Sequence, residues 1–401
     1  MNERVPEGWK IKSFGDFLIS LPKSTLPSGV ADKLGYYDFY VCSKKVLKYF
    51  HREMSSPAVL FSTGGEASVH FAAGNYSYST DVWATEFTGE ICNEYAFRVL
   101  EKNLKQINYA GFQGSGIKHL DKGFIQRFTF SLPSLPEQKK IASILTSVDE
   151  VIENTQKQIN KLQDLKKATM NELLTNGIGH TEFKDSELGR IPKSWNIIKL
   201  SDIRDITDKY SFTGGPFGSN LKRENYTEKG IRIIQLQNIG DGQFFNKYKI
   251  YTSGEKADEL LSCNIYPGDI ILSKMGDPVA RATLIPDFNA RYLMASDGIR
   301  LSVDDEKYDS KFILDSINHH TFRNQAEISS TGSTRKRIGL VELRRLKIST
   351  SSLIEQKKIA SIFISFDEAI DKKQKNNNKL KSLKKSLMQD LLTGKVRVTV
   401  N

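Results

Sequence analysis

Residues that could form a catalytic site are few in this 401-residue sequence. Pro286-Asp287 followed by Asp309-Ser310-Lys311 gives the P-D…D-x-K outline of metal-dependent nucleases. The D/E-x-K part of that outline recurs at Glu137, Glu355 and Asp371, in segments with a helical pattern. The outline therefore carries little weight, and we do not predict a nuclease site from it.

Other catalytic and metal-binding motifs are missing from the sequence. The six histidines include the adjacent pair His319-His320, but they show no H-E-x-x-H or related ligand spacing. There is no G-x-S-x-G nucleophile elbow, no G-x-x-x-x-G-K-[ST] phosphate loop and no N-P-P-[FY] amino-methylase motif. We therefore expect no catalytic residue, no metal ligand and no cofactor in this chain.

The charge balance points to a polyanionic partner. There are 58 Lys and Arg against 47 Asp and Glu, which gives a net charge of +11 and a pI near 9.2. Such a balance favours nucleic acid first and an anionic membrane surface second. Cys42, Cys92 and Cys263 lie far apart without a C-x-x-C pair, which argues against disulfides and a zinc ribbon. Without a signal peptide or an apolar run near ~18 residues, we expect a cytoplasmic protein.

Polar side chains in and beside glycine- and serine-rich loops are the candidates for binding DNA. Backbone amides of residues 213–220 and 62–65 could hold phosphate, although a plain turn is an equally good interpretation of each loop. Between residues 331 and 347 there are six Lys or Arg and one acid, and residues 114–119 are a shorter version of this stretch. The candidates are Ser115, Lys118, His119, Ser219, Lys222, Arg223, Gln237, Asn238, Lys274, Arg335, Lys336 and Arg337. For reading base edges the candidates are Gln235, Gln237, Asn238 and Lys274.

An internal repeat sets the architecture that must position these residues. The segment that begins Glu137-Gln138-Lys139-Lys140 reappears 218 residues later, and about 24 of 41 aligned positions are identical. Upstream, Val5-Pro6-x-x-Trp9 resembles Ile191-Pro192-x-x-Trp195. The chain therefore reads as globule, helix, globule, helix.

Each repeated segment is predicted to be one long amphipathic helix. Apolar residues recur at steps of three and four without an internal Pro or Gly, and Gly177 and Gly394 follow the last apolar turns. A helix from Glu137 to Leu174 would be roughly 57 Å long. Two related stripes can pack as a coiled coil, and antiparallel pairing would give the chain an internal pseudo-twofold symmetry.

Polar residues interrupt the apolar stripes at Thr155, Lys166 and Asn377. One interpretation is partial solvation of these side chains. The other is that these side chains form buried polar contacts that fix the register of the two helices. The sequence leaves the two open.

The segments between the helices are predicted to be mixed α+β domains. Short runs rich in Val, Ile, Tyr and Phe alternate with Gly, Asn, Asp and Ser. We expect strands at 37–42, 58–61, 124–130, 232–236, 269–273 and 298–303, and a short helix at 311–317. The predicted division of the chain is a first globule at 1–135, a helix at 136–178, a second globule at 179–353 and a helix at 354–401.

This sequence resembles the specificity (S) subunits of type I restriction-modification systems over essentially its whole length. The matching motifs are the two Pro-x-x-Trp entries, Gly-Pro-Phe-Gly-Ser-Asn-Leu-Lys at 215–222, Gln-Leu-Gln-Asn-Ile at 235–239 and Gly-Asp-Ile at 268–270. The twin Glu-Gln-Lys-Lys-Ile-Ala helices that end in Leu-Leu-Thr complete the set. In this order, and duplicated, the motifs are highly specific.

The resemblance implies a non-catalytic subunit that gives a DNA-modifying complex its sequence specificity. Each globule would be a target recognition domain that reads one half of an interrupted, asymmetric DNA sequence, and the helices would be a spacer between the half-sites. Two methylase subunits would dock on the helices and methylate adenine with S-adenosylmethionine. Two restriction subunits would add an ATP-driven motor and nuclease, so that S-adenosylmethionine, ATP and Mg²⁺ would belong to partner subunits.

The first globule departs from the family pattern. It has no counterpart of Gly-Pro-Phe-Gly-Ser, although Tyr36-x-Asp38-Phe39-Tyr40 resembles another style of recognition domain in the same family. The two half-sites should therefore differ. Lys44, Lys45 and Thr63 join Ser115, Lys118 and His119 as the DNA-binding candidates of this globule.

Two other classes of function are left open by the sequence. One is a single-chain nuclease or methylase, which would need chemistry that no motif provides. The other is a coiled-coil scaffold or decoy that binds acidic partners.

Overall fold

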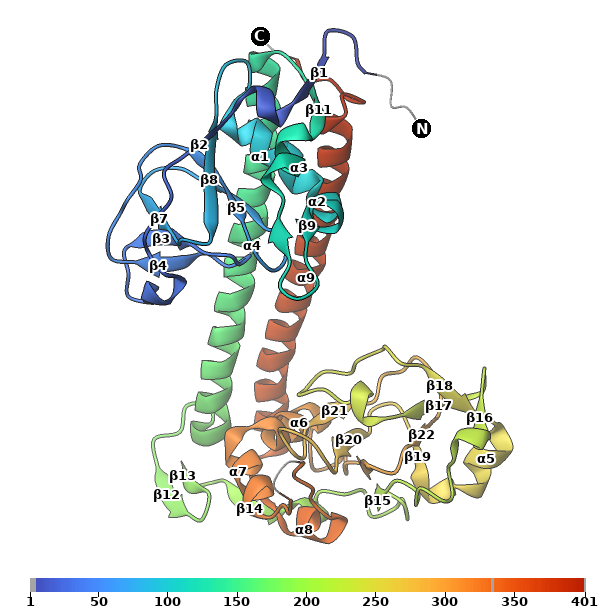
Figure 1. Cartoon of the computed structure of the whole chain (residues 1–401). Helices are drawn as coiled ribbons and strands as arrows, with labels where there is room; N and C mark the ends of the chain where they lie inside the picture. Colours follow the sequence, from blue (N-terminus) through green and yellow to red (C-terminus); the bar gives the residue numbers. More distant parts are fainter. Residues whose placement is uncertain (1–4, 333–334, 400–401) are drawn as a thin grey trace. The chain divides into compact units, whose positions relative to one another are not determined.

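The computed structural model describes residues 5–332 and 335–399 (Figure 1). Residues 333 and 334, in the basic stretch, lie outside the described residues. The chain divides into two compact units, which we call the first unit (residues 1–158 and 373–401) and the second unit (159–372). Both long helices, α4 (Leu135–Asn176) and α9 (Leu353–Leu392), contribute a piece to each unit.

The first unit contains two main sheets. The four-stranded antiparallel sheet has the order β2 (Leu18–Ser20), β8 (Val82–Phe87), β5 (Ala58–Ser62), β6 (Val69–Ala72). The three-stranded sheet has the order β4 (Leu47–Tyr49), β3 (Tyr37–Tyr40), β7 (Tyr76–Tyr78), with β3 parallel to β7. The pairs β1 (Lys10–Ser13) with β11 (Thr129–Leu132) and β9 (Phe112–Gln113) with β10 (His119–Leu120), and the helices α1 (Asn93–Lys102), α2 (Leu104–Ala110) and α3 (Lys122–Arg127), complete it.

The second unit also contains two main sheets. One has the order β15 (Phe212–Gly214), β23 (Gly298–Leu301), β20 (Ile270–Ser273), β21 (Ala282–Leu284). The other has the order β16 (Tyr226–Thr227), β18 (Ile250–Thr252), β17 (Ile231–Ile234), β22 (Tyr292–Met294), β19 (Asn264–Ile265), with β17 parallel to β22. The pairs β12 (Phe183–Ser186) with β13 (Gly189–Pro192) and β14 (Asn196–Lys199) with β24 (Lys347–Thr350), and the helices α5 (Gly254–Glu259), α6 (Ser310–Asn318), α7 (His320–Ile328) and α8 (Leu340–Arg345), complete it.

The two units have the same core topology. The order β2-β8-β5-β6 corresponds strand by strand to β15-β23-β20-β21, and the parallel pair β3/β7 corresponds to β17/β22. This similarity extends beyond the helices, where the sequence repeat is visible, into the α+β globules. The prediction of two mixed α+β domains separated by long helices is confirmed.

A tryptophan fastens each globule to the start of its repeated helix. The Trp9 indole Nε1 donates to the Glu137 carboxylate at 3.1 Å, and the Trp195 indole Nε1 donates to the Glu355 carboxylate at 3.1 Å. The next residue of each helix, Gln138 or Gln356, is fully buried, and its side-chain oxygen accepts from the backbone amide that precedes α1 or α6. The repeated Glu-Gln pair at the start of the two helices therefore makes the same buried contacts in both units.

The helices α4 and α9 lie antiparallel within each unit (Figure 1). In the first unit Lys384 pairs with Asp149 and Asn377 donates to Gln156, so that seven residues forward on α4 match seven residues back on α9. In the second unit Lys166 pairs with Asp367. The predicted antiparallel pairing is confirmed.

The polar residues that interrupt the apolar stripes form hydrogen bonds or ion pairs within the protein. Thr155 and Asn377 are only 9% and 2% exposed, which contradicts the interpretation of partial solvation. The Thr155 hydroxyl donates to the Val151 carbonyl on its own helix, whereas Asn377 and Lys166 bind side chains of the opposite helix. Asn377 and Lys166 therefore act on the register, because a shifted helix would leave these polar groups without partners.

Helix ends are part of the core of each globule. Ile141 and Leu145 of α4 and Leu391 of α9 pack in one cluster with Trp9 and Phe130 in the first unit. In the second unit the corresponding cluster joins Leu174, Ile359 and Phe363 to Trp195. Long helices with only a narrow apolar stripe thus gain their stability from the globules that they enter.

One predicted strand is wrong. Residues 122–127 form helix α3, and only 129–132 form a strand, where a strand was expected over 124–130. The apolar residues Phe124, Ile125 and Phe128 are spaced by one and three, which fits one face of a helix, and Ile125 is fully buried. The other expected strands, and the helix at 311–317, are present within one or two residues.

Candidate nucleic-acid interface

Backbone hydrogen bonds between residues 63–65 and 118–120 bring the predicted DNA-binding loops of the first unit together. We call this paired region the junction of the unit. The Gly65 amide donates to the Lys118 carbonyl at 2.9 Å, and the Leu120 amide donates to the Thr63 carbonyl at 3.0 Å. The loop that follows β5 is thereby paired with the segment around His119. Two regions that are more than fifty residues apart in sequence form one edge.

The second unit repeats this junction. The Gly276 amide donates to the Lys336 carbonyl at 3.2 Å, and the Ile338 amide donates to the Lys274 carbonyl at 2.9 Å. Met275 forms an isolated antiparallel β-bridge with Arg337, and Gly64 forms one with His119. Lys274 therefore occupies the place of Thr63, and Arg337 occupies the place of His119.

The backbone behind the two junctions is also the same. The Thr63 amide donates to the Asp81 carbonyl at 3.1 Å, and the Lys274 amide donates to the Asp297 carbonyl at 2.8 Å. One scaffold thus presents Thr63 and His119 in one unit and Lys274 and Arg337 in the other. Different side chains on one scaffold can contact different base edges.

The remaining candidates of the first unit surround its junction. Lys44 pairs with Glu66 at 2.9 Å, which links the loop after β3 to the loop after β5. The Thr63 amide also donates to the Cys42 sulfur, in the same loop as Lys44. The exposed candidates around this junction are Lys44, Lys45, Ser115, Lys118 and His119, and Thr63 is half-buried beside them.

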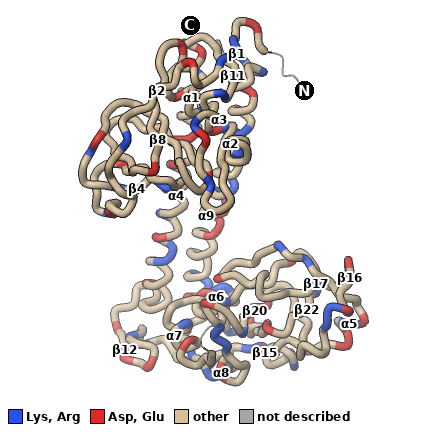
Figure 2. The backbone as a smooth tube through the Cα atoms, viewed as in Figure 1, with Lys and Arg blue, Asp and Glu red and all other residues tan. Residues whose placement is uncertain are grey.

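Apart from Lys274, which follows β20, the candidates of the second unit lie on three segments. Ser219, Lys222 and Arg223 are exposed on the loop that follows β15. Gln237 is exposed on the turn after β17, and Arg335, Lys336 and Arg337 precede α8, where blue segments gather in Figure 2. Lys336 is paired with Glu327, and Arg337 is paired with Asp297 at 2.9 Å.

Asn238 does not belong to this surface, and its prediction as a base-reading residue is corrected. The side chain is fully buried. Its amide nitrogen donates to the carbonyls of Phe245 and Lys247 at 3.0 and 2.7 Å, and its oxygen accepts from the Gln235 amide at 3.0 Å. Asn238 therefore holds the turn that presents Gln237, and it has no polar group left for DNA.

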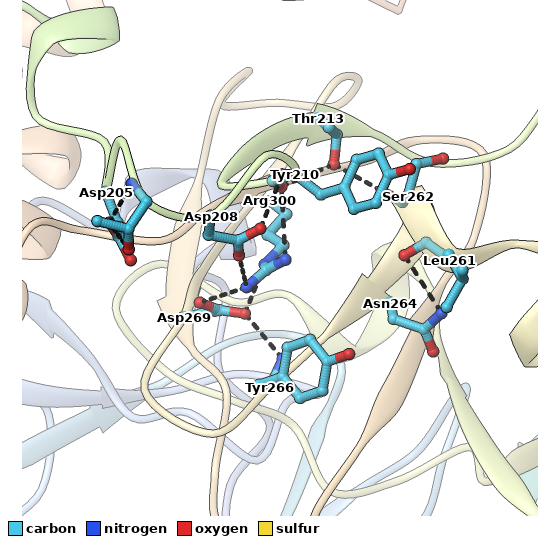
Figure 3. Close-up of polar contacts among 11 residues, drawn as sticks. Asp205, Asp208, Tyr210, Thr213, Leu261, Ser262, Asn264, Tyr266, Asp269 and Arg300 are labelled. Atoms are coloured by element: carbon cyan, nitrogen blue, oxygen red, sulfur yellow. Dashed lines mark hydrogen bonds and ion pairs between the residues drawn. The ribbon is translucent and has the colours of Figure 1, made fainter.

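A buried ion-pair network positions the glycine-rich loop of the second unit (Figure 3). The Arg300 guanidinium lies 2.7 Å from both the Asp208 and the Asp269 carboxylates. Beside it, the Thr213 hydroxyl donates to the Ser262 carbonyl at 2.7 Å, at the start of the loop (Figure 3). Arg300 is the strand partner of Thr213, so this network holds the strand from which the loop leaves the sheet.

Lys274 lies at the junction with its ammonium group bound to a backbone carbonyl. Its ammonium group donates to the Ser296 carbonyl at 3.0 Å. Burial lowers the pKa of Lys274, and the positive charge of Arg337 lowers it further. A phosphate close to both cations would relieve this repulsion, which suits a contact to the DNA backbone.

Three residues of this surface were not predicted from the sequence: Phe217, Ser296 and Asp297. Phe217 was visible in the Gly-Pro-Phe-Gly-Ser motif, and an aromatic residue flanked by glycines is the signal that could have found it. Ser296 and Asp297 carry no such signal, because only the fold brings their turn next to Lys274 and Arg337.

The nuclease outline has structural roles in the second unit. Asp309 caps α6 by accepting from the amides of Lys311 and Phe312. The Lys311 ammonium lies 2.8 Å from Asp315 and 3.2 Å from Asp367. In the part of the chain that the structure describes, no group of three or more His, Cys, Asp and Glu could hold a metal ion.

Comparison with known proteins places these features in a family. The model of the type I restriction modification DNA specificity domain matches residues 6–164 and 192–382, once in each half of the chain. The chain belongs to the type I restriction-modification DNA specificity family. It is therefore a DNA-specificity subunit without a catalytic role of its own, which binds DNA and assembles with the other subunits of such a system, as the sequence predicted.

Named relatives of this specificity family span nearly the whole chain. The MjaVIII specificity subunit of Methanocaldococcus jannaschii is 28% identical over 98% of this chain and 94% of its own length. The EcoDI specificity subunit of Escherichia coli is 22% identical over 98% of this chain and 91% of its own length. The S subunit from M. genitalium has the same fold, with a TM-score of 0.67 at 15% identity over 100% of this chain and 98% of that one.

In the described residues no helix is long and apolar enough to cross a membrane.

Proposed function

We propose that this specificity subunit reads a bipartite, asymmetric DNA target, with one half-site bound by each unit. The observation that carries the proposal is the duplicated junction, at which Thr63 and His119 in the first unit stand in the places of Lys274 and Arg337 in the second. A shared scaffold lets both units approach DNA in the same way, whereas unlike side chains select unlike bases. The half-sites are therefore different sequences of similar length.

The paired helices supply the spacing and the docking surface of the complex. The proposal is that α4 and α9 set the gap between the half-sites and that two methylase subunits bind equivalent faces of them. Leu165 and Leu383 support this, because they are repeat-equivalent residues and both are unusually exposed, at 54% and 49%. Because the same apolar residue is exposed once in each repeat, each repeat can bind one copy of the same partner.

The chemistry of the complex is assigned to the partners. S-adenosylmethionine would be bound by the methylase subunits, and ATP and Mg²⁺ by the restriction subunits. The proposal places the assembly in the cytoplasm, where DNA and these cofactors meet.

Modification-sensitive sequencing of DNA from cells that carry this chain and its methylase tests the proposed function. The expected result is a single modified motif composed of two different half-sites with a fixed gap. Cells with the methylase alone are the control and should lack the motif. A contiguous motif, a palindromic motif, or modification without this chain would refute the proposal.

A further inference from the structure

A small open cavity lies beside the glycine-rich loop of the second unit. Its volume is about 280 Å³, and it is lined by the loop, by the turn after β17 and by the turn before β23. Among the lining residues, Phe217 is 82% exposed, whereas Leu221 is buried. The polar lining comes from Gln235, Gln237, Ser296 and Asp297. The cavity therefore combines an apolar wall with hydrogen-bonding groups, as sites for planar ligands do.

The cavity wall is held in place by close backbone packing. A Cβ at Gly215 would overlap the Ala295 carbonyl oxygen, and one at Gly214 would lie 2.9 Å from the Lys274 Nζ. The Gly215 amide donates to the Gly298 carbonyl at 2.8 Å. The two glycines thus let the loop that carries Phe217 lie directly against the turn before β23 and against Lys274.

Two glutamines, Gln235 and Gln237, contribute to the polar lining. The Gln237 amide nitrogen donates to the Gln235 side-chain oxygen at 2.9 Å. This bond orients the Gln237 amide and uses one of its two N–H groups. One N–H and the carbonyl oxygen remain, which is the pair that binds N7 and N6 of adenine in the major groove.

The acid in the lining does not oppose DNA. Asp297 is paired with Arg337 at 2.9 Å. An unpaired carboxylate here would repel phosphate, but the ion pair with Arg337 cancels its charge. Lys274, whose ammonium donates to the Ser296 carbonyl, then gives the net positive charge beside the cavity. The surroundings of the cavity are therefore compatible with a nucleic-acid backbone.

We propose that this cavity reads one A·T pair of the half-site bound by the second unit. Gln237 hydrogen-bonds the adenine, and Phe217 contacts the methyl group of the paired thymine. The inference rests on the proposed function, and it adds which residues select which base pair.

Mapping of modified sites in cells that carry the full chain and its methylase tests this assignment. Phe217→Ala and Gln237→Ala should each relax one and the same A·T position of the second unit's half-site, with about ten- to hundredfold weaker discrimination there. The other half-site and the gap should be unchanged. Phe217→Leu, which keeps an apolar contact, should retain most of the discrimination.

Matched substitutions in the same unit serve as controls. Phe288→Ala and Gln243→Ala remove exposed side chains outside the cavity lining and should leave the motif unchanged. If a cavity variant abolishes modification, binding of its purified complex to duplexes that differ at each base pair of the wild-type motif replaces the mapping. Loss of discrimination at a G·C pair, or unchanged discrimination at every position, would overturn the assignment. A wild-type motif that is bipartite would still support the proposed function in that case, whereas a wild-type motif that is not bipartite would refute both.

Discussion

The Lys384 ammonium lies 2.7 Å from the Asp149 carboxylate, where α9 passes α4 in the first unit. The repeat-equivalent residues, Lys166 and Asp367, form the corresponding ion pair in the second unit with the helices exchanged. One ancestral segment with a lysine and an aspartate at these positions would supply both pairs. The same pair of repeated residues therefore stabilises the antiparallel register of the helices once in each unit.

Removal of this register contact should destabilise the first unit. Lys384 also lies 2.7 Å from Glu101, and its side chain is largely buried. Lys384→Ala therefore removes one of the two cations that these carboxylates share, and Arg98 is left as the ion-pair partner of both. We expect a loss of about 1–3 kcal/mol in the free energy of unfolding, measured by urea denaturation. The neighbouring Lys385 is exposed, and Lys385→Ala should change stability by less than about 0.5 kcal/mol. Equal effects of the two substitutions would contradict the role assigned to Lys384.

The C-terminal tail should be needed for the stability of the first unit. Arg397 binds the buried Glu137 carboxylate with two bonds, of 2.7 and 2.9 Å, and its guanidinium lies over the Trp9 ring. Arg397→Ala should cost about 2 kcal/mol, because a buried carboxylate loses its charged partner. Arg397→Lys should rescue only part of the loss, since lysine cannot form the two-bond fork. Thermal unfolding checks this, with the exposed Lys395→Ala as a control that should be silent.

A buried histidine should make the second unit sensitive to acid. Burial, with the nearby His320, lowers the pKa of His319 from 6.5 to about 4. The unfolded chain therefore takes up this proton near pH 6.5 while the folded chain resists it, so stability is lost as the pH falls from 6.5 towards 4 and is complete above 6.5. The loss amounts to about 3 kcal/mol. Urea denaturation across this range should give a flatter profile for His319→Gln than for the wild type, whereas His51→Gln, at an exposed site, should keep the wild-type slope.

The proposed docking faces should act independently and equivalently. Leu165→Asp and Leu383→Asp each place a charge at one exposed apolar contact point. Each should remove one methylase subunit from the purified complex, and the double variant should remove both, because a buried charge opposes an apolar interface. Mass measurement of the complex by light scattering checks the stoichiometry. Glu153→Lys and Asp371→Lys change exposed charges at other positions of the two helices and should leave the mass unaltered.

The helix length should set the gap in the recognised sequence. Insertion of four residues after Leu174 adds roughly 6 Å of helix and should widen the gap by one or two base pairs, at ~3.4 Å each. Modification-sensitive sequencing reads the gap directly. Both half-sites should remain as in the wild type, and an insertion that changes a half-site but not the gap would count against a spacer role.

The sequence by itself determined the architecture and the family. The repeat of Glu137-Gln138 at Glu355-Gln356, together with the 3.6-residue periodicity, predicted two long helices that pair antiparallel, because local propensity and apolar spacing are properties of the chain alone. The DNA-specificity function followed from motifs in a fixed order. The error at 124–130 arose where a short apolar run fits strand and helix equally well.

Only the tertiary structure decided which side chains share a surface. The Thr63 carbonyl accepts from the Leu120 amide, and the Lys274 carbonyl accepts from the Ile338 amide. These bonds join segments more than fifty residues apart and bring Thr63 beside His119 and Lys274 beside Arg337. Asn238, which is adjacent to Gln237 in sequence, is turned inwards by three hydrogen bonds. Residue type indicates which groups could bind DNA, but exposure and neighbours depend on how distant strands pair, and no local pattern contains that information.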